Sequence, residues 1–104
     1  MKRIASVMTV YKDQYTEYQR RHDELWPEME KVLKEHGVHH YSIFLLKETG
    51  QLFAYLLVEN EEQYMKISET DICQKWWEYM EPLMETNVDK SPVSKELKEV
   101  FYLE

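Results

Sequence analysis

A group of aromatic and imidazole side chains lies in this sequence where a small domain usually places aliphatic residues. Tyr18 and His22 are four residues apart on a predicted helix, on the side expected to face the core. A second predicted helix carries the adjacent pair Trp76 and Trp77. A hydrophobic core does not need an imidazole, a phenol and two indoles together. The combination predicts a site for a small polar ligand with one proton-transfer group.

The chemistry follows from the individual side chains. His22 can give and take a proton near neutral pH, because unperturbed imidazole titrates at about pH 6.5. Tyr18 lies one helical turn earlier, and Tyr41 can add a hydroxyl from the middle of a predicted strand. Trp76 and Trp77 offer flat apolar surfaces with one N–H donor each. Such a lining suits a sugar, whose C–H faces stack on indole and whose hydroxyls need polar partners.

Several of these residues also have a purely structural interpretation. A single helical histidine is more often a satisfied part of the fold than a catalyst. Trp76 and Trp77 point about 100° apart on a helix, so one of them could belong to the core. Trp26 precedes Pro27 and is expected to be a packing anchor. Cys73 has no basic neighbour and is expected to be a small buried residue rather than a nucleophile.

Length and composition exclude several classes of protein. Residues 1–104 are expected to form one domain with one modest core. The net charge of −7 argues against a nucleic-acid partner. No stretch approaches membrane-spanning length, the first residues lack a signal-peptide pattern, and the single cysteine fits a reducing compartment, so a cytoplasmic location is expected. With two glycines and no zinc-like spacing, neither a nucleotide loop nor a metal site is expected.

Hydropathy and turn signals predict the order strand, helix, strand, strand, helix, strand. The predicted strands cover residues 3–11, 38–47, 51–59 and 98–103. The first predicted helix begins after the N-cap Asp13, should kink or break between His22 and Pro27, and stops at Gly37. The second covers residues 61–84, with a break near 68–70, Thr70 as the cap of its later part, and an end or kink at Pro82.

This order predicts an α+β fold with a ferredoxin-like βαββαβ antiparallel sheet. Both central strands are apolar on both sides; on the first of them Ile43 and Leu45 mark one face, and Phe44 and Leu46 the other. A sheet with one face in water would instead alternate apolar and polar residues. Because two helices cover only one face, a second copy of the same sheet is the simplest cover. The sequence therefore predicts a homodimer formed by sheet packing.

Motifs along the chain resemble those of the L-rhamnose mutarotase family. They are Tyr-Gln-Arg-Arg-His at 18–22, Trp-Pro-Glu at 26–28, Tyr41, Cys-Gln-Lys-Trp-Trp at 73–77, and the ending at 91–94 and 99–103. The resemblance covers essentially the whole chain, although Asp23-Glu24 and Val88 depart from the expected pattern.

The resemblance implies a dimeric α/β barrel of ferredoxin-like subunits. The implied function is that of an isomerase which interconverts the α and β anomers of L-rhamnose by acid–base catalysed ring opening and closure. It also implies that His22 is the proton donor. The implied sugar-binding residues are Tyr18, Tyr41, Trp76 and Trp77. Ring opening of a hemiacetal needs proton transfers only, so no cofactor is expected.

Two other functions stay open at this point. Small dimeric barrels also include cofactor-free oxygenases and isomerases of other small substrates, which an aromatic site would suit equally. Alternatively, the domain could be a non-catalytic sugar sensor in which His22 only forms a hydrogen bond to the ligand.

Overall fold

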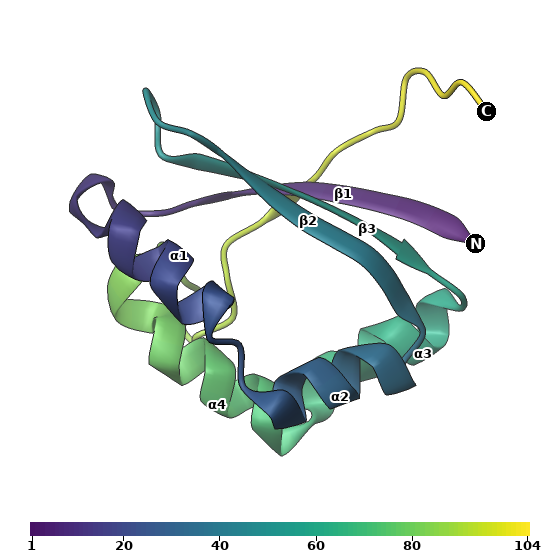
Figure 1. Cartoon of the computed structure of the whole chain (residues 1–104), viewed down its shortest axis with the longest axis horizontal. Coiled ribbons are helices and arrows are strands. Elements are labelled where there is room, and N and C mark those ends of the chain that lie inside the picture. The colour runs from purple at the N-terminus through teal and green to yellow at the C-terminus, as the bar shows by residue number, and fades with distance from the viewer.

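The computed structural model describes residues 1–104 and contains four β-strands and four α-helices (Figure 1). The strands are β1 (Lys2–Thr9), β2 (Val38–Leu46), β3 (Gln51–Val58) and β4 (Lys95–Glu96). The helices are α1 (Tyr15–Asp23), α2 (Pro27–Glu35), α3 (Glu61–Met65) and α4 (Asp71–Met80). Short 3₁₀ helices cover Lys12–Gln14, Lys66–Glu69 and Glu81–Leu83. None of the helices has the length and apolar character needed to cross a membrane.

The strands form one antiparallel sheet in the order β2-β3-β1-β4, and all four α-helices lie on one side of it (Figure 1). This is the ferredoxin-like topology expected from the element order. β2 and β3 are joined by a tight turn in which Gly50 has φ +79°. A Cβ atom there would lie 2.7 Å from the carbonyl oxygen of Val10, so this position requires glycine for both conformation and space.

The predicted helix breaks are confirmed. The first predicted helix is divided into α1 and α2, and Pro27 is the first residue of α2, where its missing N–H costs no hydrogen bond. In the second helical region, the Thr70 hydroxyl accepts a bond from the N–H of Cys73 at 3.3 Å and caps α4. The predicted cap at Asp13 is wrong. Asp13 lies inside a 3₁₀ turn closed by the Gln14 N–H to Tyr11 carbonyl bond, and α1 begins at Tyr15.

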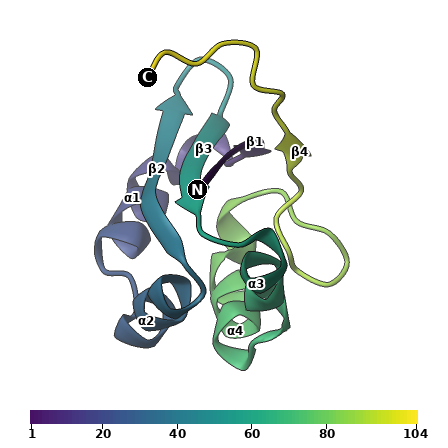
Figure 2. The same ribbon diagram turned by 90° about the vertical axis from the view of Figure 1, so that its right-hand side faces the viewer.

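The last predicted strand, over 98–103, is also wrong. β4 contains only Lys95 and Glu96, which pair with Val7 and Ser6 of β1. After Leu97 the chain leaves the edge of β1 and continues as an extended tail beyond the sheet (Figure 2). The apolar composition of the tail favoured a strand, but backbone pairing with β1 stops at the bond from the Leu97 N–H to the Ala5 carbonyl. Beyond it, side chains connect the tail to β1, because Arg3 donates to the Glu99 carboxylate and lies over the Tyr102 ring.

The two faces of the sheet differ in what covers them. On the helix side, alternate residues of β3 are 0–3% exposed and form the centre of the core; they are Leu52, Ala54, Leu56 and Val58. On the other side, which we call the open face, Phe44 is 67% exposed and lies opposite Phe53 of β3. Tyr55 on the same face is 37% exposed. Apolar residues therefore occupy both faces, as expected from the sequence, although helices cover only one.

Candidate active site

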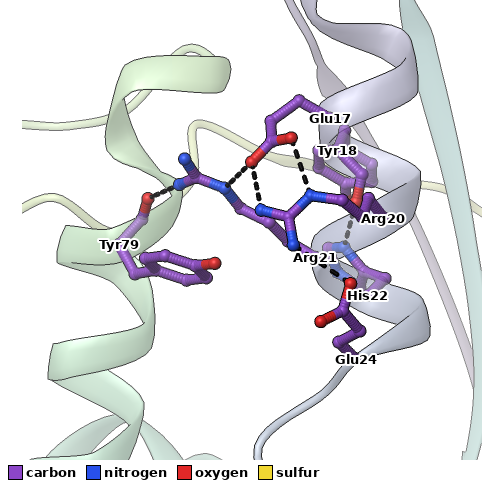
Figure 3. A network of polar contacts seen from close by, with 7 residues as sticks. All are labelled: Glu17, Tyr18, Arg20, Arg21, His22, Glu24 and Tyr79. Carbon is purple, nitrogen blue, oxygen red and sulfur yellow. Dashed lines mark hydrogen bonds and ion pairs between the residues drawn. The ribbon is translucent and has the colours of Figure 1, made fainter.

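His22 lies in the last turn of α1 and has one ring nitrogen free for chemistry. Its Nδ1 is 3.1 Å from the carbonyl oxygen of Tyr18 (Figure 3). Since a carbonyl only accepts hydrogen bonds, Nδ1 carries the hydrogen and donates it. Nε2 is therefore the atom at which the imidazole gains or loses a proton. The Tyr18 ring stacks on the imidazole with 4.4 Å between centroids and 27° between planes, which fixes its orientation.

The imidazole also contacts Trp76 of α4. The two rings meet edge to face, with centroids 5.3 Å apart and an angle of 87°. Tyr18 and Trp76 are 7% and 8% exposed, so His22 lies between two buried aromatic rings. This burial lowers the pKa of His22 below its usual value of 6.5, against the opposing effects of the bond to Tyr18 and the nearby charge of Asp23. At pH 7 the neutral ring predominates.

Two phenols of the predicted site, Tyr18 of α1 and Tyr41 of β2, lie near each other. Burial raises the pKa of Tyr18, and the proximity of Tyr41 raises it further. Burial likewise raises the pKa of Tyr41, with contributions from Tyr64 and Cys73. As a whole residue, Tyr41 is 44% exposed. Both phenols therefore stay protonated at neutral pH and can donate a hydrogen bond to a ligand.

Trp77 does not join this cluster. It lines a hollow of about 340 Å³ together with Gln74, Glu78, Asp89 and Lys90, next to the loop that follows α4. Adjacent residues on a helix point about 100° apart, so Trp76 and Trp77 cannot both face His22. The structure brings together the rings of Tyr18, His22 and Trp76. Tyr41 is close enough to Tyr18 to raise its pKa, and Trp77 lines the hollow next to the loop after α4.

Other aromatic residues extend the cluster beyond those singled out in the sequence. Trp26 lies edge-on to Trp76 at 5.1 Å, consistent with the packing role expected for it. Tyr79 packs against both indoles, at 5.1 Å from Trp26 and 5.6 Å from Trp76. Its position three residues after Trp76 places both on one side of α4, and this spacing could have identified Tyr79 from the sequence.

Cys73 is a structural residue in this fold. It is 4% exposed, and burial raises the pKa of its thiol to about 11. A thiol with this pKa is almost entirely protonated at neutral pH and is a poor nucleophile. The expectation of a small buried side chain is consistent with this environment.

Fold and site together define a small ferredoxin-like protein that presents a half-buried imidazole, with one free nitrogen, between a phenol and an indole. The sequence profile of the L-rhamnose mutarotase family matches residues 3–103. The chain belongs to this family.

Individual relatives agree with this assignment. An L-rhamnose mutarotase of Shouchella clausii is 70% identical over 103 residues, which is 99% of each chain. The L-rhamnose mutarotase of Bacillus subtilis is 61% identical over 104 residues and the full length of both chains. A crystal structure of an L-rhamnose mutarotase from Formosa agariphila superposes with a TM-score of 0.92 at 43% identity and covers 100% of both chains. A putative antibiotic biosynthesis monooxygenase from Nitrosomonas europaea, at 12% identity and a TM-score of 0.64, shares the fold alone.

Proposed function

We propose that the protein is an isomerase that interconverts the α and β anomers of L-rhamnose. The observation that carries the proposal is the free Nε2 of His22 inside an aromatic cluster, in a chain 70% identical to an L-rhamnose mutarotase. Nε2 supplies the proton transfer that a hemiacetal needs. The rings of Tyr18 and Trp76 supply surfaces against which a sugar can pack.

The reaction requires two proton movements. In the mechanism we propose, imidazolium His22 gives its Nε2 proton to the ring oxygen. The anomeric hydroxyl loses its proton to solvent, either through a bound water molecule or through the Tyr18 or Tyr41 hydroxyl, which accepts this proton as it passes its own to water. The C1–O bond then breaks and leaves an open-chain aldehyde. Rotation about C1–C2 turns the other carbonyl face toward the ring oxygen. Closure returns one proton to His22 and the other to the new anomeric hydroxyl, so the enzyme ends unchanged.

The lowered pKa of His22 predicts how kcat/KM for anomer exchange depends on pH. The imidazolium is fully present below this pKa and is lost as the pH rises through it, so kcat/KM should fall as the pH rises from acid to neutral values. The midpoint should lie below 6.5. Rates of exchange at each pH, corrected for the buffer reaction, would check this. A kcat/KM that rises over the same range would instead make His22 the base that deprotonates the anomeric hydroxyl.

The two tryptophans should differ in their effect on sugar binding. Because the Trp76 ring contacts His22, Trp76→Phe should raise the KM for L-rhamnose about 3- to 10-fold, the range of one aromatic contact. Trp77 lines the hollow next to the loop after α4 and not the cluster around His22, so Trp77→Phe should alter KM less than about twofold. Initial rates over a range of sugar concentrations separate the two variants. An equal rise in KM for both would place Trp77 in the sugar site.

The proposal extends to assembly and location. The apolar open face of the sheet supports a homodimer in which two sheets pack face to face, since exposed Phe44 and Tyr55 would be covered by the partner. One structural relative at 15% identity is described as a dimeric ferredoxin-like protein.

The single free Cys73 fits a protein of the reducing cytoplasm.

Polarimetry of freshly dissolved α-L-rhamnose tests the proposed activity. The approach to anomeric equilibrium should accelerate in proportion to protein. L-mannose, which carries a hydroxyl in place of hydrogen at C6, is the matched substrate and should be accelerated less, because the aromatic cluster favours a methyl group. Absence of acceleration with L-rhamnose would contradict the proposed function.

A further inference from the structure

Arg21, the residue before His22, connects α1 to α4. Its Nε donates to a Glu17 carboxylate oxygen at 2.7 Å, and its Nη1 donates to the backbone carbonyl of Tyr79 (Figure 3). The guanidinium also lies over the Tyr79 ring, 4.1 Å from its centroid. One side chain therefore binds a carboxylate on its own helix, and a carbonyl and an aromatic face on the other helix.

These contacts belong to a closed series of neighbouring residues that includes His22, the proposed acid. Arg21 contacts Tyr79, the Tyr79 ring packs 5.6 Å from that of Trp76, and the Trp76 ring lies 5.3 Å from that of His22. The peptide bond between Arg21 and His22 closes this series of contacts. A shift of α1 relative to α4 would therefore disturb Arg21 and the His22–Trp76 contact together.

Each partner of Arg21 suits a fixed cation. The Tyr79 carbonyl is in the last turn of α4, where carbonyls lack partners within the helix and the helix dipole favours positive charge. Two arginines, Arg20 and Arg21, lower the pKa of Glu17 to about 2, so its carboxylate is ionised throughout the working pH range. The Arg21 side chain is only 18% exposed, which limits competition from water.

Helix α1 depends on such contacts for its orientation. It is nine residues long, shorter than helices that are stable alone, and its N-cap Gln14 makes no side-chain capping bond. We propose that Arg21 is a positioning residue that fixes α1 against α4 and thereby sets the placement of the His22 ring against Trp76. This inference rests on the proposed function, in which His22 must meet the ring oxygen of the sugar.

Three variants test it. Arg21→Lys keeps a cation but lacks the planar fork that reaches Glu17 and Tyr79 at once, and Arg21→Met removes the charge as well. Both should lower kcat about 10- to 100-fold, the expected cost of a misplaced catalytic group, with a smaller change in KM.

Arg20→Met is the matched control. Arg20 also binds Glu17, at 2.6 and 2.9 Å, and Glu24, and the Tyr79 side chain contributes to its raised pKa. Only Arg21, however, bonds the Tyr79 backbone carbonyl and lies over the Tyr79 ring, and the Arg20 side chain is 49% exposed. This variant should keep kcat within about twofold. Circular dichroism compares the folds, and if Arg21→Met unfolds, Arg21→Lys decides the test.

A second measurement does not depend on activity. NMR titration of the His22 ring proton on Cε1 should show a midpoint that moves upward in both Arg21 variants, because the ring gains contact with water, and stays in place in Arg20→Met. Unchanged kcat and midpoint in the Arg21 variants would overturn the inference, as would equal changes in the control. If the unmodified protein proves inactive, the proposed function fails, and the titration alone decides whether Arg21 positions His22.

Discussion

His22→Ala is expected to lower the protein-dependent rate of anomer exchange by about 10²- to 10⁴-fold, the usual contribution of a general acid or base. The substitution removes Nε2, the nitrogen left free when Nδ1 binds the Tyr18 carbonyl. The fold should persist, because alanine favours helix and His22 lies only one residue before the end of α1. Anomer exchange rates compare the activity of His22→Ala with that of the unmodified protein, and circular dichroism compares their folds.

His36→Ala is the matched control for this variant. His36 also directs its Nδ1 to the carbonyl four residues earlier, with 2.8 Å to the Val32 oxygen, and it directly follows α2, as His22 lies in the last turn of α1. The two imidazoles share this local geometry, but the stacking with Tyr18 and the contact with Trp76 belong to His22. His36→Ala should keep full activity. If His22→Ala retained activity within about threefold of the unmodified protein, His22 would not be the acid of the mechanism.

Phe44→Glu is expected to convert a dimer into monomers. Phe44 is 67% exposed and pairs with Phe53 on the open face, so two such faces packed together would bury it twice, once from each copy. Each glutamate would place an unpaired charge in that interface, which costs several kcal/mol per ion. Sedimentation at about 10 μM should give twice the chain mass of 12.8 kDa for the unmodified protein and 12.8 kDa for the variant.

Val88→Glu is the control for the dimer prediction. It makes the same kind of change at a fully exposed apolar residue in the loop after α4, away from the open face, and should leave the dimer intact. A monomeric unmodified protein would contradict the sheet-packed dimer. A dimeric Phe44→Glu variant would show that another surface forms the contact.

Features that depend on neighbouring residues could be predicted from the sequence. The break at Pro27, the cap at Thr70 and the turn at Gly50 each follow from a local rule of backbone geometry or hydrogen bonding. The grouping of Tyr18 with His22 also followed from helical spacing. The ferredoxin-like order followed because these local signals were correct in type and sequence.

Features that depend on distant contacts could not be predicted in the same way. The hydrogen bond from Arg21 to the Tyr79 carbonyl joins residues 58 positions apart, and no local sequence pattern predicts it. The apolar tail after Leu97 resembled a strand, but it contacts β1 through the Arg3 side chain, which binds Glu99 and lies over Tyr102, and not through backbone pairing. Trp77 was grouped with Trp76 by adjacency, and only the packing of α4 decides which of the two faces His22.

The central claim is that this chain speeds the exchange of L-rhamnose anomers through His22. NMR saturation transfer between the α and β anomeric protons, at equilibrium and over a range of protein concentrations, measures that exchange directly. The account predicts an exchange rate that rises in proportion to protein and returns to the buffer value in His22→Ala. Exchange equal to that in buffer at every protein concentration would contradict it.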